Sequence, residues 1–143
     1  MRSRIVLVAG TLMVLGAAVA VVAALVETDE ERIEKLVEEM RVAALDRDVP
    51  GLLAGVSEDV EYPGGREALR RRIESVLERH PPDHISVELR DLEVDGDGAE
   101  AEVEVWYTTR TLGGRPGRVT FRTRFGRGED GWRVVGLATD VGG

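Results

Sequence analysis

The stretch AEAEVEVWYTT, residues 99–109, largely decides how the sequence folds. Small or apolar side chains alternate strictly with glutamates and a tryptophan along it, which is the two-residue period of a β-strand. We expect Ala101 and Val105 to face a core, and Glu104 and Trp106 to face away from it. One apolar and one polar face are typical of a strand in an antiparallel sheet.

The segment before this strand predicts its hairpin partner. Apolar residues alternate over 85–89 and again over 92–94, but the parity shifts between the two runs. One extra residue in a strand causes such a shift, so we expect a β-bulge near Arg90-Asp91. Asp95-Gly96-Asp97-Gly98 then supplies the residue types that favour a tight hairpin turn.

Two more strands are predicted after it. Residues 119–125 alternate between apolar or threonine side chains and arginines, and the last strand covers 132–141 after a turn at 126–131. If the turn before residue 119 centres near Gly114, charged and aromatic side chains match across the two central strands. The matched pairs would be Glu104 with Arg124, Trp106 with Arg122, and Tyr107 with Phe121.

Helices are predicted on the N-terminal side of these strands. The sequence Thr28-x-x-Glu31 has capping-box spacing, and apolar residues over 33–44 then recur on one helical face. Asp48-Val49-Pro50 predicts a short second helix, and residues 66–80 predict a third that two prolines end. Helices followed by an antiparallel meander indicate an α+β fold class.

Residues 1–27 are predicted to be a membrane anchor. The segment Ile5–Val26 contains no charged residue. At about 1.5 Å per residue, a helix of this length spans the roughly 30 Å hydrocarbon core of a bilayer. Arg2 and Arg4 precede it and acidic residues follow it. The positive-inside rule therefore places the N-terminus in the cytoplasm and residues 28–143, the predicted domain, outside it.

A cleaved signal peptide is the alternative for this N-terminal segment. Ala18-Val19-Ala20 has the small-residue pattern of a cleavage site. The apolar run continues past it to Val26, which is longer than the hydrophobic part of a usual signal peptide. We therefore favour the retained anchor over secretion, and both alternatives export the domain.

The composition excludes several classes of function. The chain has 27 acidic and 19 basic residues and a net charge of −8, so phosphate backbones repel it and no nucleic-acid partner is expected. It has no cysteine, which excludes disulfides, thiolate metal sites and a cysteine nucleophile.

Several short segments carry a family resemblance. They are ALDRD at 44–48, SEDVEY at 57–62, GREAL at 65–69, VDGDGA at 94–99 and DGWRV at 130–134. With them the sequence, over about residues 28–141, resembles the nuclear-transport-factor-2-like superfamily, which includes SnoaL-like and ketosteroid-isomerase-like domains. The resemblance implies a cone-shaped, cystatin-like fold in which a curved antiparallel sheet wraps around the helices and leaves a pocket between them. It also implies that two copies associate through the sheet.

The resemblance does not extend to the catalytic groups of the family's isomerases. Those enzymes use a carboxylate base after the first strand, a tyrosine in the first helix and a carboxylic acid on the sheet. The position that matches the base is Tyr62, and an ordinary phenol, with a pKa of about 10, is a poor base at neutral pH. The first predicted helix contains no tyrosine. We therefore assign no catalytic residue, and the candidates for lining the pocket are Tyr62, Asp91, Val105, Tyr107, Phe121 and Thr123.

Two histidines invite a metal-site hypothesis. His80 and His84 flank Pro81-Pro82-Asp83. A cationic side chain at a helix end is favoured by the helix dipole, which explains His80 without a metal. We expect neither a metal nor a cofactor.

Two classes of function remain. The first is a non-catalytic module at the membrane, which binds a small apolar ligand or serves as an assembly or scaffold piece. The alternative is a SnoaL-like enzyme, an isomerase, cyclase or hydratase, that acts on a hydrophobic small molecule. The anchor and the missing catalytic groups favour the first.

Overall fold

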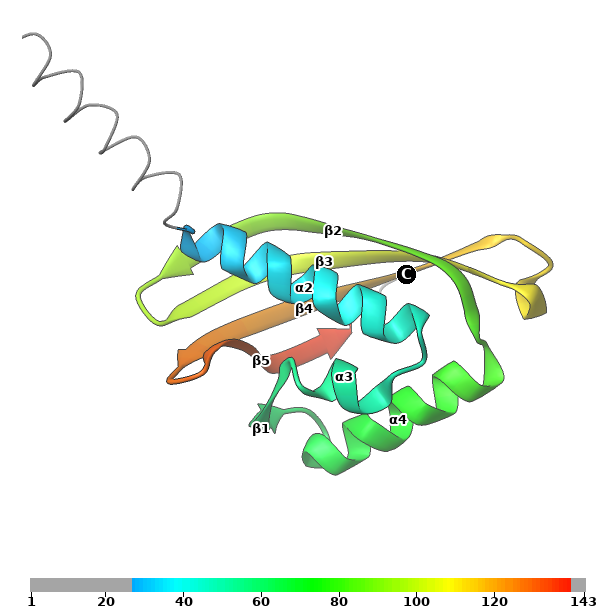
Figure 1. Cartoon of the computed structure of the whole chain (residues 1–143), viewed down its shortest axis with the longest axis horizontal. Coiled ribbons are helices and arrows are strands. Elements are labelled where there is room, and N and C mark those ends of the chain that lie inside the picture. Colours follow the sequence, from blue (N-terminus) through cyan, green and yellow to red (C-terminus); the bar gives the residue numbers. More distant parts are fainter. Residues whose placement is uncertain (1–26, 140–143) are drawn as a thin grey trace, which may run out of the picture.

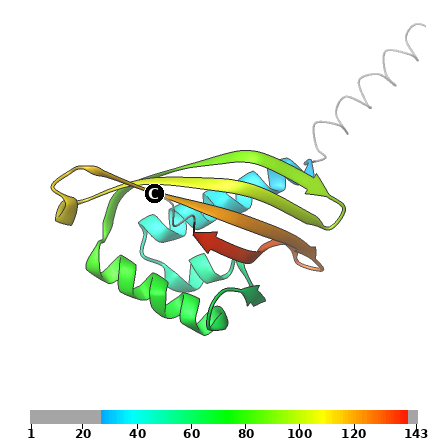
Figure 2. The ribbon, with the colours of Figure 1, turned by 180° about the vertical axis from the view of Figure 1, so that it is seen from behind.

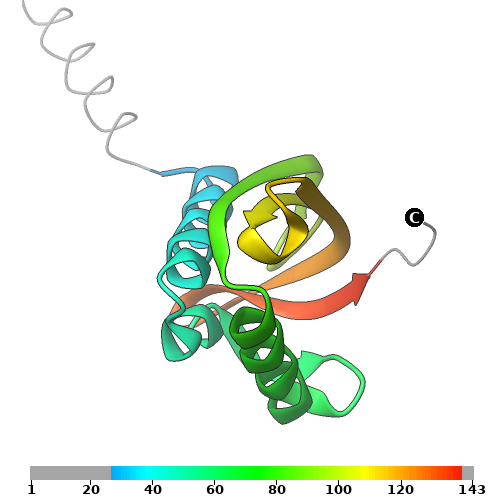
Figure 3. The same cartoon turned by 90° about the vertical axis from the view of Figure 1, so that its right-hand side faces the viewer.

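Three α-helices lie on one side of a five-stranded sheet in the computed structural model, which describes residues 27–139 (Figures 1 and 2). The elements are, in order, α2 (Asp29–Leu45), α3 (Val49–Leu53), β1 (Val56–Glu61), α4 (Gly65–Arg79), β2 (Pro82–Asp95), β3 (Gly98–Thr109), the 3-10 helix η1 (Arg110–Leu112), β4 (Pro116–Gly128) and β5 (Gly131–Thr139). The strand order is β1-β5-β4-β3-β2, with β1 parallel to β5 and the other neighbours antiparallel. Figure 3 shows how strongly the sheet curls. The α+β class and the curved sheet are thus confirmed.

The helices begin where the sequence predicts them. The Thr28 hydroxyl accepts a hydrogen bond from the Glu31 amide at 3.2 Å, and Thr28 N–H donates to the Glu31 carboxylate at 3.4 Å, which completes the capping box of α2. The Asp48 side chain caps α3 by accepting from the Gly51 amide at 3.1 Å. These caps fix where each helix starts.

The bulge and the first hairpin turn also match the prediction. The pairing of β2 with β3 shifts between Arg90 and Glu93, and Asp91 has a φ of +53°. Gly96, in the turn, has a φ of +60°, a conformation that glycine adopts without strain. The bulge keeps the apolar residues on both sides of it facing the core.

The register of the central hairpin was predicted incorrectly. Glu104 pairs with Thr120, not with Arg124, and Trp106 pairs with Arg118. The chain turns earlier than expected, through η1 and then Gly113 and Gly114, whose φ values are +63° and +79°. The shift is an even number of residues, so every side chain keeps its predicted face and only its partner changes.

The core lies between α2, α3 and the concave face of the sheet. Ile33 of α2 is fully buried and Phe125 of β4 is 2% exposed. Burying each such side chain contributes about 1.5–3 kcal/mol. Around them pack the other buried apolar residues of this cluster: Leu36, Leu53, Val56, Val60, Leu69, Ala99, Ala101, Val103, Trp132 and Val134.

A polar cluster ties the start of α2 to two turns of the sheet. Asp29 accepts hydrogen bonds from Trp132 Nε1 and Arg127 Nη1, both at 3.2 Å. Arg127 also donates to Asp97 at 2.7 Å and lies over the Trp132 ring, 5.6 Å from its centroid. The first helical turn is therefore held against the β2–β3 and β4–β5 turns.

The predicted anchor, Ile5–Val26, lies outside the described residues. Within 27–139, no helix is long and apolar enough to cross a membrane.

Candidate functional site

The concave face of the sheet carries several of the residues predicted to line a pocket. Val105 of β3 and Phe121 of β4 are half-buried and pack against the core. Thr123, further along β4, is 2% exposed, and its hydroxyl has no hydrogen-bond partner among residues 27–139. Tyr62 is half-buried and packs against the core from the segment between β1 and α4.

Asp91 lies apart from these candidates. It is exposed at the bulge of the edge strand β2, in the left-handed backbone region that aspartate tolerates better than most residues. It lines no part of the hollow that we describe next.

Helix α4 leaves part of its apolar stripe uncovered. Leu69 is 5% exposed and Ile73 is half-buried against the core, but Val76, one turn further along, is 42% exposed. Leu77 beside it is half-buried. The stripe therefore runs from the core to the surface.

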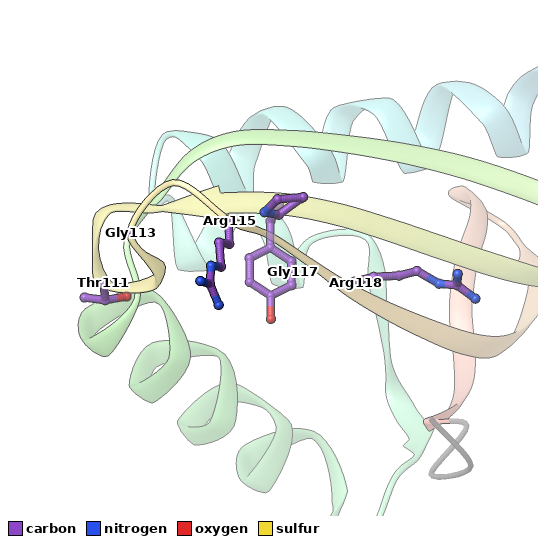
Figure 4. A pocket seen from close by; sticks show the side chains of 7 residues that line it. Thr111, Gly113, Arg115, Gly117 and Arg118 are labelled. Carbon is purple, nitrogen blue, oxygen red and sulfur yellow. The ribbon is translucent and has the colours of Figure 1, made fainter.

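A hollow of about 760 Å³, wide open to solvent, lies beside the β3–β4 hairpin (Figure 4). Its charged residues are two arginines, and its lining contains no carboxylate. Tyr107 is the one predicted pocket residue in the lining, which consists of Tyr107, Thr111, Gly113, Arg115, Pro116, Gly117 and Arg118.

Tyr107 covers the backbone of its cross-strand partner, Gly117. A β-carbon at Gly117 would lie 2.4 Å from Tyr107 Cζ and 2.7 Å from the phenol oxygen, far inside van der Waals contact. Only glycine at this position leaves room for the tyrosine ring, which forms an aromatic surface at the hollow.

A hydrogen-bonded chain joins the end of α4 to the hairpin. His80 Nδ1 lies 2.8 Å from the Thr111 hydroxyl, which lies 2.7 Å from the hydroxyl of Thr109. The His80 amide donates to the carbonyl of Val76 at 2.9 Å. The C-terminal end of α4 is thus close to the hollow.

The two arginines of the hollow differ in their partners. Arg118 Nε lies 3.1 Å from Glu104 Oε1, and its guanidinium stacks over Trp106 at 5.3 Å from the ring centroid. Arg115 is exposed and has no ion pair or hydrogen bond from its side chain to any described residue. Figure 4 shows the two side chains pointing in different directions from the hairpin.

Glu104 is a buried carboxylate that the sequence analysis missed. It lies on the outward face as predicted, but it is 1% exposed. Arg90 Nη2 lies 2.7 Å from its Oε2, while Arg118 approaches Oε1 at an angle too poor for a hydrogen bond. The Glu104 carboxylate, followed by that of Glu88, raises the pKa of Arg90. Trp106, predicted to pair with Arg122, pairs with Arg118 in the observed register, and the Arg118 guanidinium stacks over its ring.

The lining of the hollow is rich in hydrogen-bond donors, because guanidinium, phenol and hydroxyl groups all donate hydrogen bonds. In the part of the chain that the structure describes, no group of three or more histidine, aspartate or glutamate side chains could hold a metal ion. The sequence pattern predicted a turn near Gly114 and gave Arg115 no role. Its one signal was an arginine among glycines with no acidic neighbour.

No protein-family model matches the chain, and no curated protein gives a significant match. Solved structures do match. A variant of the chain Rd1NTF2_05 superimposes with a TM-score of 0.64 at 19% identity, covering 78% of this chain and 99% of that one. A protein of unknown function from Mycobacterium tuberculosis gives 0.59 at 26% identity, with 76% and 70% covered.

A third structure names the fold in words. An NTF2-like protein of unknown function from Pseudomonas putida KT2440 gives a TM-score of 0.59 at 21% identity, covering 75% of this chain and 82% of that one. The fold is therefore the nuclear-transport-factor-2-like one that the sequence resemblance implied. The likeness shows the fold, and the function has to be argued from the site.

Proposed function

We propose that this protein is a non-catalytic ligand-binding module, exported and held at a membrane, that binds a small apolar molecule between α4 and the concave face of the sheet. The observation that carries the proposal is that apolar side chains of α4 and of the concave face are left partly uncovered. Val76 is 42% exposed, and Val105 and Phe121 are half-buried. Burying a fully exposed side chain of this kind contributes about 1.5–3 kcal/mol. Covering the part that is still exposed contributes less, and a few such contacts together are enough to hold a small ligand.

The chemistry of the neighbouring groups supports binding over catalysis. Efficient proton transfer needs a group whose pKa lies near the working pH, in reach of the substrate. By the sequence resemblance, Tyr62 stands at the position of the carboxylate base of the related isomerases. The hollow contributes arginines, a phenol and a hydroxyl. None of these is a good base at neutral pH in its ordinary state.

The membrane part of the proposal rests on the sequence. The uncharged run Ile5–Val26 is long enough to span a bilayer, and Arg2 and Arg4 before it favour an exported domain. In a membrane preparation, alkaline carbonate should leave the full-length chain in the pellet, and protease added outside should digest residues after 27. Release by carbonate would instead support a cleaved signal peptide.

Ligand binding is tested with a neutral apolar probe, N-phenyl-1-naphthylamine. The full-length chain is held in zwitterionic nanodiscs, and bound probe is detected by energy transfer from Trp106 and Trp132, the two tryptophans of the chain. Val76→Ser should weaken probe binding about two- to fivefold, because it removes apolar contact area.

The matched control is Val42→Ser. Val42 is 43% exposed but lies on the outer face of α2, among the exposed Lys35, Glu38 and Glu39. It should leave probe binding unchanged. No protein-dependent signal, or equal effects of the two variants, would reject the ligand site and leave an assembly or scaffold role.

We also propose that two copies associate through the outward face of the sheet. Trp106 is 37% exposed there beside Arg118, and tryptophan and arginine are enriched in protein interfaces. Trp106→Gln should lower self-association in analytical ultracentrifugation of the full-length chain, whereas Val42→Gln should not. A sedimentation profile unchanged by Trp106→Gln would exclude this face.

A further inference from the structure

The hollow beside the β3–β4 hairpin is positively charged in a strongly acidic protein. The chain carries a net charge of −8, yet the lining of the hollow has two arginines and no carboxylate. A patch of positive charge on an acidic protein attracts anionic ligands. The hollow is therefore a place where an anion is stabilised and a cation is not.

Arg115 carries the positive charge that remains available. Arg118 is held by Glu104 at 3.1 Å and by the Trp106 ring, which directs its charge toward the outward face. The Arg115 side chain makes no ion pair or hydrogen bond with any residue from 27 to 139. It shares the hollow with the Tyr107 phenol, a second hydrogen-bond donor.

The polar hollow continues into the apolar concave face. Successive inward positions on β3 are Tyr107 and then Val105, and on β4 they are Gly117, Val119 and Phe121. The Tyr107 ring forms an aromatic surface over Gly117. Beyond it on the same face lie the half-buried apolar side chains of Val105, Val119 and Phe121. One molecule can therefore contact a guanidinium at one end and apolar side chains at the other.

We propose that Arg115 binds the anionic head of a free amphiphile whose apolar body lies on the concave face. The inference rests on the proposed function for the apolar half of the site and adds the class of ligand. The head is a carboxylate, a sulfonate or a phosphate monoester, because a guanidinium forms paired, charge-assisted hydrogen bonds with each of these.

Two related probes separate the charged from the apolar contribution. N-phenyl-1-naphthylamine is neutral, and 8-anilino-1-naphthalenesulfonate adds a sulfonate to the same arylamine framework. With the full-length chain in zwitterionic nanodiscs, Arg115→Gln should weaken binding of the sulfonate about two- to fivefold, the range expected for a solvent-exposed ion pair. It should leave the neutral probe unchanged, and added salt should reduce the difference.

Arg110→Gln is the matched control. Arg110 is exposed on the same hairpin, in η1, and is absent from the lining of the hollow, so its replacement makes the same change in net charge. Equal effects of the two variants on the sulfonate, or equal effects of Arg115→Gln on both probes, would overturn the inference.

The remaining outcomes distinguish this inference from the proposed function. If neither probe binds the unaltered chain, the apolar site and the anionic head site both fail. If the neutral probe binds with the expected dependence on Val76 and Arg115 has no selective effect, only the present inference fails. Arg115-dependent binding to phosphatidylglycerol vesicles without binding of the free sulfonate would make the hairpin a membrane contact and would also overturn it.

Discussion

Replacing Glu104 with glutamine should destabilise the domain far more than any other charge removal on the outward face of the sheet. The residue is 1% exposed, and its carboxylate lies 2.7 Å from Arg90 Nη2 and 3.1 Å from Arg118 Nε. Glutamine keeps the shape of glutamate, so Glu104→Gln opens no cavity. It removes the negative charge and replaces one of the two carboxylate oxygens by an NH2 group, which cannot accept a hydrogen bond from a guanidinium.

The size of the effect follows from how exposed the partners are. Removing one member of a fully buried ion pair costs about 3–5 kcal/mol, because the other charge stays buried and unpaired. Here the Arg90 and Arg118 side chains are 47% and 56% exposed, so both recover hydration when the carboxylate is lost. We therefore expect a loss of about 2–3 kcal/mol in the free energy of unfolding at neutral pH.

The assay is urea unfolding of the full-length chain in a mild detergent, followed by tryptophan fluorescence. Glu100→Gln is the control, since Glu100 lies on the same strand and face but is exposed, and its loss should change stability by less than about 0.5 kcal/mol. In a background that carries Arg90→Gln and Arg118→Gln, the cost of Glu104→Gln should shrink. A Glu104→Gln effect no larger than that of Glu100→Gln would refute the assignment of Glu104 as a buried, charge-compensated group.

Three further changes test other parts of the structure. Gly117→Ala should cost about 1–3 kcal/mol of stability, since its β-carbon would lie 2.4 Å from the Tyr107 ring, and a Tyr107→Ala background should remove most of that cost in the same urea assay. Glu67→Gln should destabilise at neutral pH but not in acid. The hydrogen bond from Arg70 lowers the pKa of Glu67 from its ordinary 4.5. The ionised carboxylate therefore stabilises the fold above that value, and this stabilisation is lost as the pH falls through the lower, folded-state pKa. Urea unfolding of both proteins at neutral and at acidic pH tests this dependence. Tyr62→Phe should alter only local stability and leave binding of the neutral probe unchanged, and any loss of a measured biological activity with folding intact would show that the phenol has a chemical role.

The faces of the strands were predictable, but their pairing was not. Alternation along residues 99–109 fixes which side chains point inward, whatever strand lies alongside. The register depends on where the chain turns, and Gly113, Gly114 and Gly117 each permit a turn. Shifting the partner of Glu104 from residue 124 to residue 120 leaves the arginines of this strand on the outward face and its apolar residues on the inward face. The sequence pattern alone is therefore compatible with both registers.

The features missed at the candidate sites have the same cause. Glu104 is buried because Arg90 on β2 and Arg118 on β4 both reach it, and that arrangement exists in the observed register only. The pairing of β1 with β5 joins segments far apart in the sequence, so no local pattern predicts it. The half-covered Val76 is likewise invisible to periodicity, which places it on the apolar stripe of α4 but cannot say where the covering core ends.

The two ends of the domain differ in charge, and this bears on how a ligand would reach the hollow. The end where residue 27 lies carries the acidic first turn of α2 and the β2–β3 and β4–β5 turns, which contain Asp95, Asp97, Glu129 and Asp130 (Figure 1). The hairpin with Arg110 and Arg115 lies at the opposite end. If Ile5–Val26 holds the chain in a bilayer, the end that carries residue 27 is tethered next to the lipid surface, and the hairpin at the opposite end lies farther from it. An amphiphile would then arrive from the aqueous side with its anionic head attracted to Arg115, so raising the fraction of anionic lipid in the nanodisc should leave the affinity for the free sulfonate nearly unchanged.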